Sequence, residues 1–322
     1  MASASSKDQP TRIFLWIIAR TNSTVFTKCM TFVEGVQVWY EPYLSCALNE
    51  TMWNPEFKKE DPVADKFRQT LKENEASDKM KEIRADMKPK VESSSFINYQ
   101  EKFKYPWVKE QLELPEPSKD FVFIKDHSFA IVDHMEALPD VPTRHTFIIR
   151  HPRQVYTSLK NVMATRMHFD GIGWEQCHLG QEAVFAPAKD LFKLHHRLWK
   201  YVKEKYETDP IVIDGQDLLS QPEVILPKYF QRLGIPFKES YLSWEASPDK
   251  PAKCWKGSAD FVLLEAQTGV TSRAVQSTQF TPPKVPRGTP SRPEWTITPE
   301  LKEYTEDAMP FYEEMYKHRI KP

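Results

Sequence analysis

Short apolar runs that alternate with helical patterns are the feature that most constrains the fold of this chain. Residues 13–18 read IFLWII, and 145–150 read HTFIIR. Such nearly continuous runs are typical of strands buried on both faces of a parallel sheet. The segments 188–207 and 222–237 have helical spacing, and Gly234 and Pro236 mark a helix end. The expected strands are 13–18, 36–40, 120–126, 145–150 and 210–215. Strands alternating with helices predict an α/β fold with a doubly wound, mainly parallel sheet flanked by helices.

The same alternation bears on domain organisation. A chain of 322 residues could form two domains, but its continuous pattern favours one domain over 12–322. Residues 1–11 are small and polar, so we expect a disordered N-terminus there. A charged helical stretch near 54–95 predicts a surface insertion or a lid. Residues 270–296, rich in Thr, Ser, Pro and Arg, predict a long loop that is either functional or disordered.

Composition narrows the classes of function. A formal net charge of −1 argues against a nucleic-acid binder. The apolar run at 13–18 is too short for a membrane span or a signal peptide. Four widely spaced cysteines without a Cys-x-x-Cys pair favour reduced thiols in a cytoplasmic protein. No HExxH motif or acidic cluster with metal-site spacing occurs, so we expect no metal. The sequence leaves a homo-oligomer open without indicating one.

The first candidate site is the turn after the run at 13–18. Residues 25–33 have helical spacing, so 21–24 should lie at a helix N-terminus, where free N–H groups and the helix dipole favour an anion. Arg20 adds a permanent positive charge, and Ser23 and Thr24 add hydroxyl donors. The alternative is that these residues only cap the helix. An arginine at the end of a buried strand favours the anion site, because an unpaired charge there is costly.

The second candidate site pairs Arg150 with Ser158. Arg150 ends another expected strand, and Pro152 fits the start of the following helix. Ser158 lies eight residues after Arg150, so the guanidinium and the hydroxyl could converge on one phosphate. The alternative makes Arg150 and Arg153 surface ion-pair partners.

The third candidate site is Lys125 with His127, just past the strand expected at 120–126. The two residues share strand parity, so their side chains should face the same side. Ligands of open parallel sheets bind beyond the carboxyl ends of the strands, where Arg20 and Arg150 should also lie. A histidine there can act as a general base near neutral pH, although a lone histidine is more often structural.

These residues resemble the sulfotransferases that use 3′-phosphoadenosine 5′-phosphosulfate (PAPS) as donor. The first motif of that family is approximately Pro-Arg/Lys-Ser/Thr-Gly-Ser/Thr-Thr, and its second motif is an Arg followed eight residues later by a Ser. Its cytosolic members carry a Lys-x-His at the end of a middle strand. The likeness covers roughly 12–46 and 118–240 and is closest to a divergent branch with a first motif Arg-Ser/Thr-x-Ser-Thr. The matching segments are Ala19-Arg20-Thr21-Asn22-Ser23-Thr24, Arg150 with Ser158, Lys125-Asp126-His127, and the Glu41-Pro42 pair seen in that branch.

The resemblance implies a P-loop NTPase-like sulfotransferase fold and a role for each residue. Arg20 with residues 21–24 would bind the 5′-phosphosulfate, and Arg150 with Ser158 the 3′-phosphate. His127 would be the general base for a hydroxyl or amine of a small-molecule acceptor, and Lys125 would neutralise the transferring sulfonate. The remaining nucleotide contacts are expected from a loop with Ser277 and Thr278 and from Arg287, a weak replacement for the family's Arg-Lys-Gly motif.

Two departures from the family keep other functions open. Ala19 replaces the usual Pro and Asn22 the usual Gly, although Asn tolerates left-handed backbone better than most residues. A catalytically degenerate, nucleotide-binding protein is therefore one alternative. A P-loop kinase is another, but the sequence has no Gly-Lys-Ser/Thr ending, and only Asp126 and Asp214 are candidates for a magnesium-binding strand end.

Overall fold

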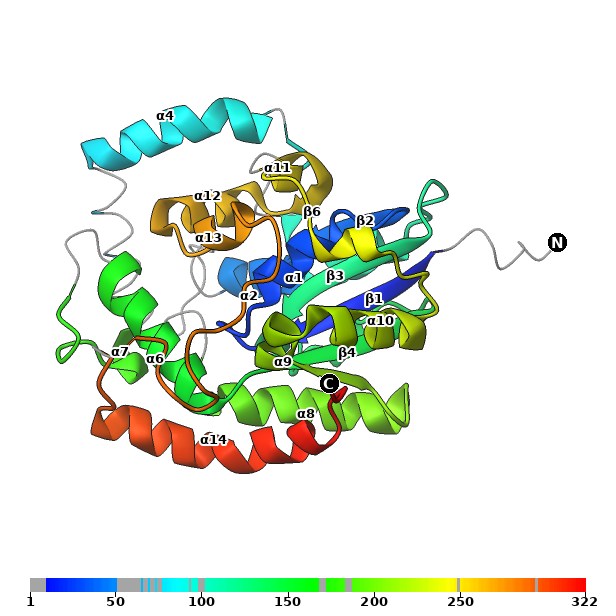
Figure 1. Ribbon diagram of the computed structural model, residues 1–322. Helices are drawn as coiled ribbons and strands as arrows, with labels where there is room; N and C mark the ends of the chain where they lie inside the picture. The colour runs from blue at the N-terminus through cyan, green and yellow to red at the C-terminus, as the bar shows by residue number, and fades with distance from the viewer. Residues whose placement is uncertain are drawn as a thin grey trace, which may run out of the picture.

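A six-stranded parallel sheet organises the computed structural model (Figure 1). The structure describes residues 10–50, 77–92, 94–97, 102–167, 172–182, 187–247, 250–292 and 295–322, together with 65, 69 and 73. The strand order in this part of the chain is β5-β4-β1-β3-β2-β6. The strands are β1 (Thr11–Ile17), β2 (Val36–Tyr40), β3 (Phe121–His127), β4 (Thr143–Ile149), β5 (Ile211–Asp214) and β6 (Trp255–Gly257).

The five expected strands are confirmed within one or two residues at each end, and the α/β class with them. Strand β6 was not expected, because its three residues Trp255–Gly257 are too few for a periodic pattern. Strand β1 is buried from Arg12 to Ile17, and it lies between β3 and β4 in the middle of the sheet. The sequence therefore indicated the central strand by its unbroken apolar run.

Helices cover both faces of the sheet. On one face lie α1 (Ser23–Met30) and α10 (Pro222–Leu233), where Phe26 packs edge-on against Phe123 and Tyr229. On the other lie α2 (Pro42–Leu48) and α8 (Leu191–Lys205). There Trp16 stacks on Tyr43 of α2, and His195 of α8 meets Phe147 edge-on. Burying each such aromatic side chain contributes about 1.5–3 kcal/mol, so these contacts fix the helices on the sheet.

The remaining helices extend these two layers. The C-terminal helix α14 packs against α6 and α8 along one side of the molecule, and α4 lies beside α12 at the opposite side (Figure 1). Of the expected insertion near 54–95, the structure describes α4 and a few residues, and the rest lies outside the described residues. The bounds are α4 (Asp78–Glu92), α5 (Tyr105–Glu113), α6 (Pro152–Val162), α7 (Leu179–Glu182), α9 (Gly215–Ser220), α11 (Lys250–Cys254), α12 (Ala259–Thr268), α13 (Ser272–Val275) and α14 (Pro299–Lys317).

Short segments cover both outer strands of the sheet. At β5, Arg319 forms a parallel bridge with Val212, and the Ile320 amide donates to the Val212 carbonyl at 2.8 Å. At β6, the Ile97 amide donates to the Gly257 carbonyl at 2.8 Å. Residues far apart in the sequence thus satisfy backbone groups that an outer strand would leave unpaired.

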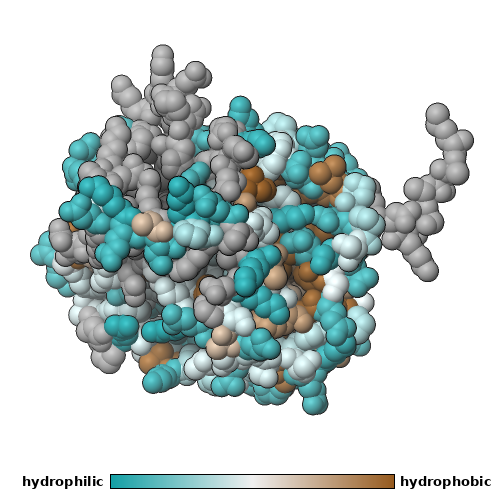
Figure 2. All heavy atoms as spheres, turned by 90° about the horizontal axis from the view of Figure 1, so that it is seen from above, coloured by the Kyte–Doolittle hydropathy of each residue, from teal (hydrophilic) through white to brown (hydrophobic). Residues whose placement is uncertain are grey.

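No helix among the described residues is both long and apolar enough to cross a membrane. Seen from above, hydrophilic side chains cover most of the coloured surface, and apolar ones reach it in scattered patches (Figure 2). The four cysteines, Cys29, Cys46, Cys177 and Cys254, are free thiols, as expected.

Candidate functional site

The carboxyl ends of the strands bring the predicted site residues to one edge of the sheet. Asp214 ends β5, Arg150 follows β4, Arg20 follows β1, and His127 ends β3. Glu41 follows β2. The chain leaves β1 toward β2 on one side and leaves β4 toward β5 on the other, so a crevice opens between β1 and β4. In open α/β sheets this switch point is where ligands bind.

The turn between β1 and α1 has the backbone of an anion-binding loop. Arg20 and Asn22 both have left-handed conformations, with φ of 70° and 69°. Asn22 thus occupies the conformation for which the family uses glycine. It forms the N-cap of α1 without a side-chain cap, and Thr21 Oγ1 instead donates to the Ile18 carbonyl at 2.7 Å. The capping alternative is therefore not supported, and the first amides of α1 keep their capacity to bind an anion.

A glycine on the neighbouring helix allows the turn to lie where it does. A Cβ atom on Gly215, the first residue of α9, would lie 2.3 Å from the Thr21 carbonyl oxygen. Such a distance is well below contact, so no larger residue fits unless the turn moves. Gly215 therefore sets how closely α9 approaches the anion turn.

Arg20, Arg150 and Ser158 meet at the crevice, as the sequence predicted. Arg20 Nε donates to Ser158 Oγ at 3.1 Å, and Arg150 Nη1 donates to the Arg20 carbonyl at 2.8 Å. Arg150 Nη2 donates to Ser291 Oγ at 3.2 Å, so both partners of Arg150 are neutral oxygens. Burial and the nearby Arg20 charge lower the pKa of Arg150 to about 10, against a weaker opposing effect of Asp214. The Arg150 guanidinium thus donates to two neutral oxygens and lies beside a second arginine.

Lys125 and His127 both reach the same carboxylate, that of Glu41. Lys125 Nζ forms an ion pair with Glu41 Oε1, and His127 Nε2 lies 3.5 Å from the same oxygen. The exposed fractions of Glu41, Lys125 and His127 are 2%, 2% and 8%. The shared parity expected for the lysine and the histidine is thus observed, and it turns both side chains toward the start of α2.

The pKa values of two carboxyl groups at this cluster are shifted in opposite directions. Burial opposes ionisation of Glu41, but the charges of Lys125 and His127 outweigh it and lower its pKa to about 2. Glu265 of α12 accepts a hydrogen bond from Tyr40 at 3.0 Å. Burial and the Glu41 charge raise the pKa of Glu265 to about 8. Near neutral pH, Glu41 is therefore ionised and Glu265 is largely protonated.

The other residues predicted to contact the nucleotide, Ser277, Thr278 and Arg287, bind partners within the protein. The Ser277 carbonyl accepts from Lys28 Nζ at 2.6 Å and from Trp244 Nε1 at 2.7 Å, and the Thr278 carbonyl accepts from the Trp244 amide. These contacts place both residues along the second half of α1, past the turn. Arg287 forms ion pairs with Asp214 and Asp217, each at 2.5 Å. The nucleotide contacts of Ser277, Thr278 and Arg287 therefore stay predictions.

The two aspartates considered for a magnesium site are engaged in structural contacts. Asp126 accepts hydrogen bonds from the amides of Tyr43, Leu44 and His127. Asp214 accepts from two amides of α9 and from the Tyr312 hydroxyl, besides its ion pair with Arg287. Among the described residues no cluster of three or more His, Cys, Asp or Glu could hold a metal ion. These contacts weaken the kinase alternative.

Glu41 is the main site residue that sequence reasoning missed. It was noted only as part of the Glu41-Pro42 pair, although it directly follows a predicted strand, as the other candidates do. Its φ of 54° makes it, with Arg20 and Asn22, one of three non-glycine residues with positive φ in the described chain. All three lie at this edge, as strained residues at functional sites often do.

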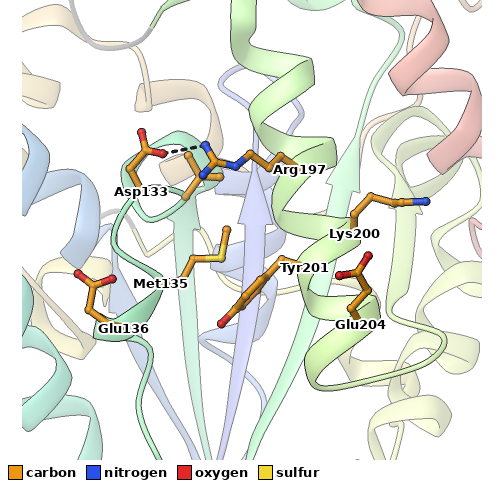
Figure 3. A pocket seen from close by; sticks show the side chains of 8 residues that line it. Asp133, Met135, Glu136, Arg197, Lys200, Tyr201 and Glu204 are labelled. Carbon is orange, nitrogen blue, oxygen red and sulfur yellow. Dashed lines mark hydrogen bonds and ion pairs between the residues drawn. The ribbon is translucent and has the colours of Figure 1, made fainter.

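One surface depression lies away from these residues. It measures about 480 Å³ and lies between α8 and the segment after β3, where Arg197 Nη1 donates to Asp133 at 2.7 Å (Figure 3). Met135 and Tyr201 line it among five charged side chains, and none of the predicted site residues does. His195 of the same helix is buried against Ser128, and His196 pairs with Glu314.

Comparisons with known proteins add little to this geometry. No family model matches the sequence, and no curated protein matches it significantly. Among solved structures, the chain is similar to a sulfotransferase domain from the curacin biosynthetic pathway. The identity is 14%, the match covers 94% of this chain and 98% of that one, and the TM-score is 0.46. At these values the similarity carries no weight for chemistry, so function must be derived from the strand ends.

Proposed function

We propose that this protein is a PAPS-dependent sulfotransferase, which moves a sulfonate group to a hydroxyl or amine of a small-molecule acceptor. The observation that carries the proposal is the meeting of Arg20, Arg150 and Ser158 at the crevice between β1 and β4. Arg150 has neutral hydrogen-bond partners and a second guanidinium beside it, which lowers its pKa. An anion with more than one negative charge would relieve this repulsion and accept charge-assisted hydrogen bonds.

The donor has two anionic groups, and the edge of the sheet has two places that suit them. The turn at 20–24, with the first amides of α1, would hold the 5′-phosphosulfate. Arg150 and Ser158 would hold the 3′-phosphate, which ATP lacks. Since Arg20 contacts Ser158, its side chain lies between the two places. This arrangement would select a nucleotide that is phosphorylated on both sides of the ribose.

The bound donor would supply the sulfonate group, and the chain would supply positioning and charge. Transfer of sulfonate should resemble phosphoryl transfer, in which protein groups mainly align the reactants and stabilise charge on oxygen. In our proposal His127 takes the proton of the acceptor, and Arg20 stabilises negative charge on the leaving 5′-phosphate. Lys125 was expected to neutralise the sulfonate; its ion pair with Glu41 competes with that role.

Calorimetry with product analogues tests donor recognition. We expect adenosine 3′,5′-bisphosphate to bind more tightly than adenosine 5′-phosphate or ATP with magnesium. Arg150→Ala should weaken bisphosphate binding about 100-fold, because charge-assisted hydrogen bonds contribute about 1.5–3 kcal/mol each. Arg153→Ala is the matched control, since Arg153 is an exposed arginine in the first turn of α6, three residues after Arg150. Equal affinity for the bisphosphate and the 5′-phosphate would contradict the proposal.

A transfer assay then tests catalysis. Radiolabelled donor with a panel of phenols, alcohols and amines should give labelled product, and His127→Ala should lower turnover by about 100-fold or more if His127 is the base. Near-normal turnover in that variant would remove His127 from this role. Binding of the bisphosphate without transfer to any acceptor in the panel or in cell extract would instead favour the catalytically degenerate alternative.

A further inference from the structure

The two ring nitrogens of His127 have different surroundings. Nε2 lies 3.5 Å from Glu41 Oε1, whereas Nδ1 is buried and has no hydrogen-bond partner. A neutral imidazole carries its hydrogen on the nitrogen that can donate it, and the other nitrogen keeps a lone pair. A carboxylate beside Nε2 therefore favours the tautomer with hydrogen on Nε2.

We propose that Glu41 is a positioning residue that holds His127 in the Nε2–H tautomer, so that Nδ1 is the atom that receives the acceptor's proton. The tautomer follows from the geometry of this chain alone, and only the transfer of the acceptor's proton to Nδ1 rests on the proposed function.

Glu41 is itself held firmly enough to orient a histidine. Its side chain is buried and pairs with Lys125, its amide donates to the Lys125 carbonyl at 2.8 Å, and its backbone is left-handed at φ 54°. The low pKa of about 2, to which Lys125 and His127 bring it against the effect of burial, keeps it ionised and makes it a poor base. The carboxylate can therefore accept a hydrogen bond from Nε2 without taking its proton.

In the part of the chain that the structure describes, the other groups around His127 do not compete for Nε2. Phe129, two residues along the chain, meets the ring edge-on with centroids 5.3 Å apart. His195 of α8 faces the cluster from the other side, but its Nδ1 pairs with Ser128, and burial lowers its pKa to about 3, so it is neutral. Glu265 of α12 is bonded to Tyr40. Lys125 and Glu41 are thus the charged groups that act on the imidazole at neutral pH.

The proton transfer balances with these groups alone. The O–H or N–H bond of the acceptor breaks, and the proton passes to the lone pair of Nδ1. The electron pair of that bond stays on the acceptor atom, which would form its bond to sulfur as the sulfur–oxygen bond of the donor breaks. The electron pair of the broken bond would leave with the 5′-phosphate, near Arg20. His127 becomes an imidazolium with hydrogens on both nitrogens, and ionised Glu41 stabilises this charge.

Nitrogen-15 NMR of histidine-labelled protein tests the tautomer without any ligand. Two-bond correlations at mildly alkaline pH should show His127, assigned by the loss of its signals in His127→Gln, with hydrogen on Nε2. Glu41→Gln should give a mixture of tautomers, and Glu41→Asp, which keeps a charge for Lys125, serves if the first variant does not fold. Glu265→Gln is the matched control and should leave the His127 signals unchanged. Hydrogen on Nδ1 in the wild type, or no change in the Glu41 variants, would overturn the proposal.

Kinetics separate positioning from a structural role. Glu41→Gln should lower kcat about tenfold, the effect of a misoriented base, while its affinity for adenosine 3′,5′-bisphosphate stays within twofold. A parallel loss of both would mean that Glu41 only maintains the fold of the site. An inactive wild type with the expected NMR result would refute the proposed function and leave the tautomer assignment standing.

Discussion

The centre of the sheet's carboxyl edge and its two flanks handle charge in opposite ways. On the β5 flank, Arg287 pairs with Asp214 and Asp217; on the β2 flank, Lys125 pairs with Glu41. At the centre, Arg150 has a carbonyl and a hydroxyl as partners, with Arg20 beside it. The cations of the flanks have acidic partners within the protein, whereas in our proposal the centre binds an outside anion. The position of excess charge, rather than the number of charged residues, therefore marks the candidate binding site.

The largest expected effect comes from comparing the replacement of an arginine on a flank, Arg287, with that of an arginine at the centre, Arg150. Arg287→Met leaves buried Asp214 without its cation, while Asp217 keeps its ion pair with Arg319, so it should lower the free energy of unfolding by about 3–5 kcal/mol. Arg150→Met removes a charge that Arg20 repels, so the ligand-free protein should keep its stability or gain some. Urea denaturation of both variants measures the difference. A similar loss in the two variants would abolish the distinction between flank and centre.

Stability against pH separates the two carboxyl groups on the β2 flank. Glu265 has a folded-state pKa raised to about 8, so the folded state holds a proton that the unfolded state releases above its ordinary value of 4.5. The contribution of Glu265 to the free energy of unfolding is therefore complete below pH 4.5 and is lost as the pH rises through about 8. Glu41 behaves in the opposite way: its pKa is lowered to about 2, so its contribution is lost as the pH falls toward 2.

Urea unfolding at about pH 6 and about pH 9 should show a loss on the order of 2 kcal/mol in the wild type that Glu265→Gln largely removes. A variant as sensitive to alkaline pH as the wild type would show that another group is responsible.

Gly215→Ala tests whether the backbone position of the turn at 20–24 matters for binding at the centre. The added methyl group would force Thr21 away from α9, so we expect a loss of about 1–3 kcal/mol in stability and weaker bisphosphate binding. Gly234→Ala is the control: Gly234 has a φ of +70° but nothing within 4 Å of an added Cβ. It should cost about 1 kcal/mol in stability and leave binding unchanged. If calorimetry showed that both variants bind the bisphosphate equally well, Gly215 would have no role in shaping the site.

The smallest effects should distinguish two serines at the centre. Ser158→Ala removes a hydroxyl from the position proposed for the 3′-phosphate, so bisphosphate affinity should fall about tenfold, the lower end of the value of a hydrogen bond to a charged group. Ser291→Ala removes an exposed partner of Arg150 and should change affinity less than twofold. If the order of the two effects were reversed, the phosphate would lie on the Ser291 side of Arg150.

Local sequence patterns were enough to predict the fold and the alignment of the strand ends. Unbroken apolar runs predicted β1 and β4, Gly234 marked the end of α10, and Asn22 took the left-handed backbone that its side chain tolerates. The left-handed conformation of Arg20 was not predictable, because nothing local distinguishes it from an arginine in an extended turn.

Long-range contacts could not be predicted from the sequence for a different reason. Ser291 and Arg287 belong to a loop rich in Pro, Ser and Thr, whose path depends on tertiary contacts rather than on periodicity. Glu265 lies on a helix 225 residues from its partner Tyr40. Glu41 could have been found, since the rule that gathered Arg20, Lys125 and Arg150 applies equally to an acid that follows a strand.

The pairing of Ile320 with Val212 and of Ile97 with Gly257 has a consequence for self-association. An outer strand with open amides and carbonyls is a template on which a strand of another molecule can add, and aggregation follows from that addition. In this protein the segment around Ile97 and the last residues of the chain occupy those positions. Removing residues 319–322 should therefore expose β5 to a second copy, and concentration-dependent association would appear before any loss of the folded core.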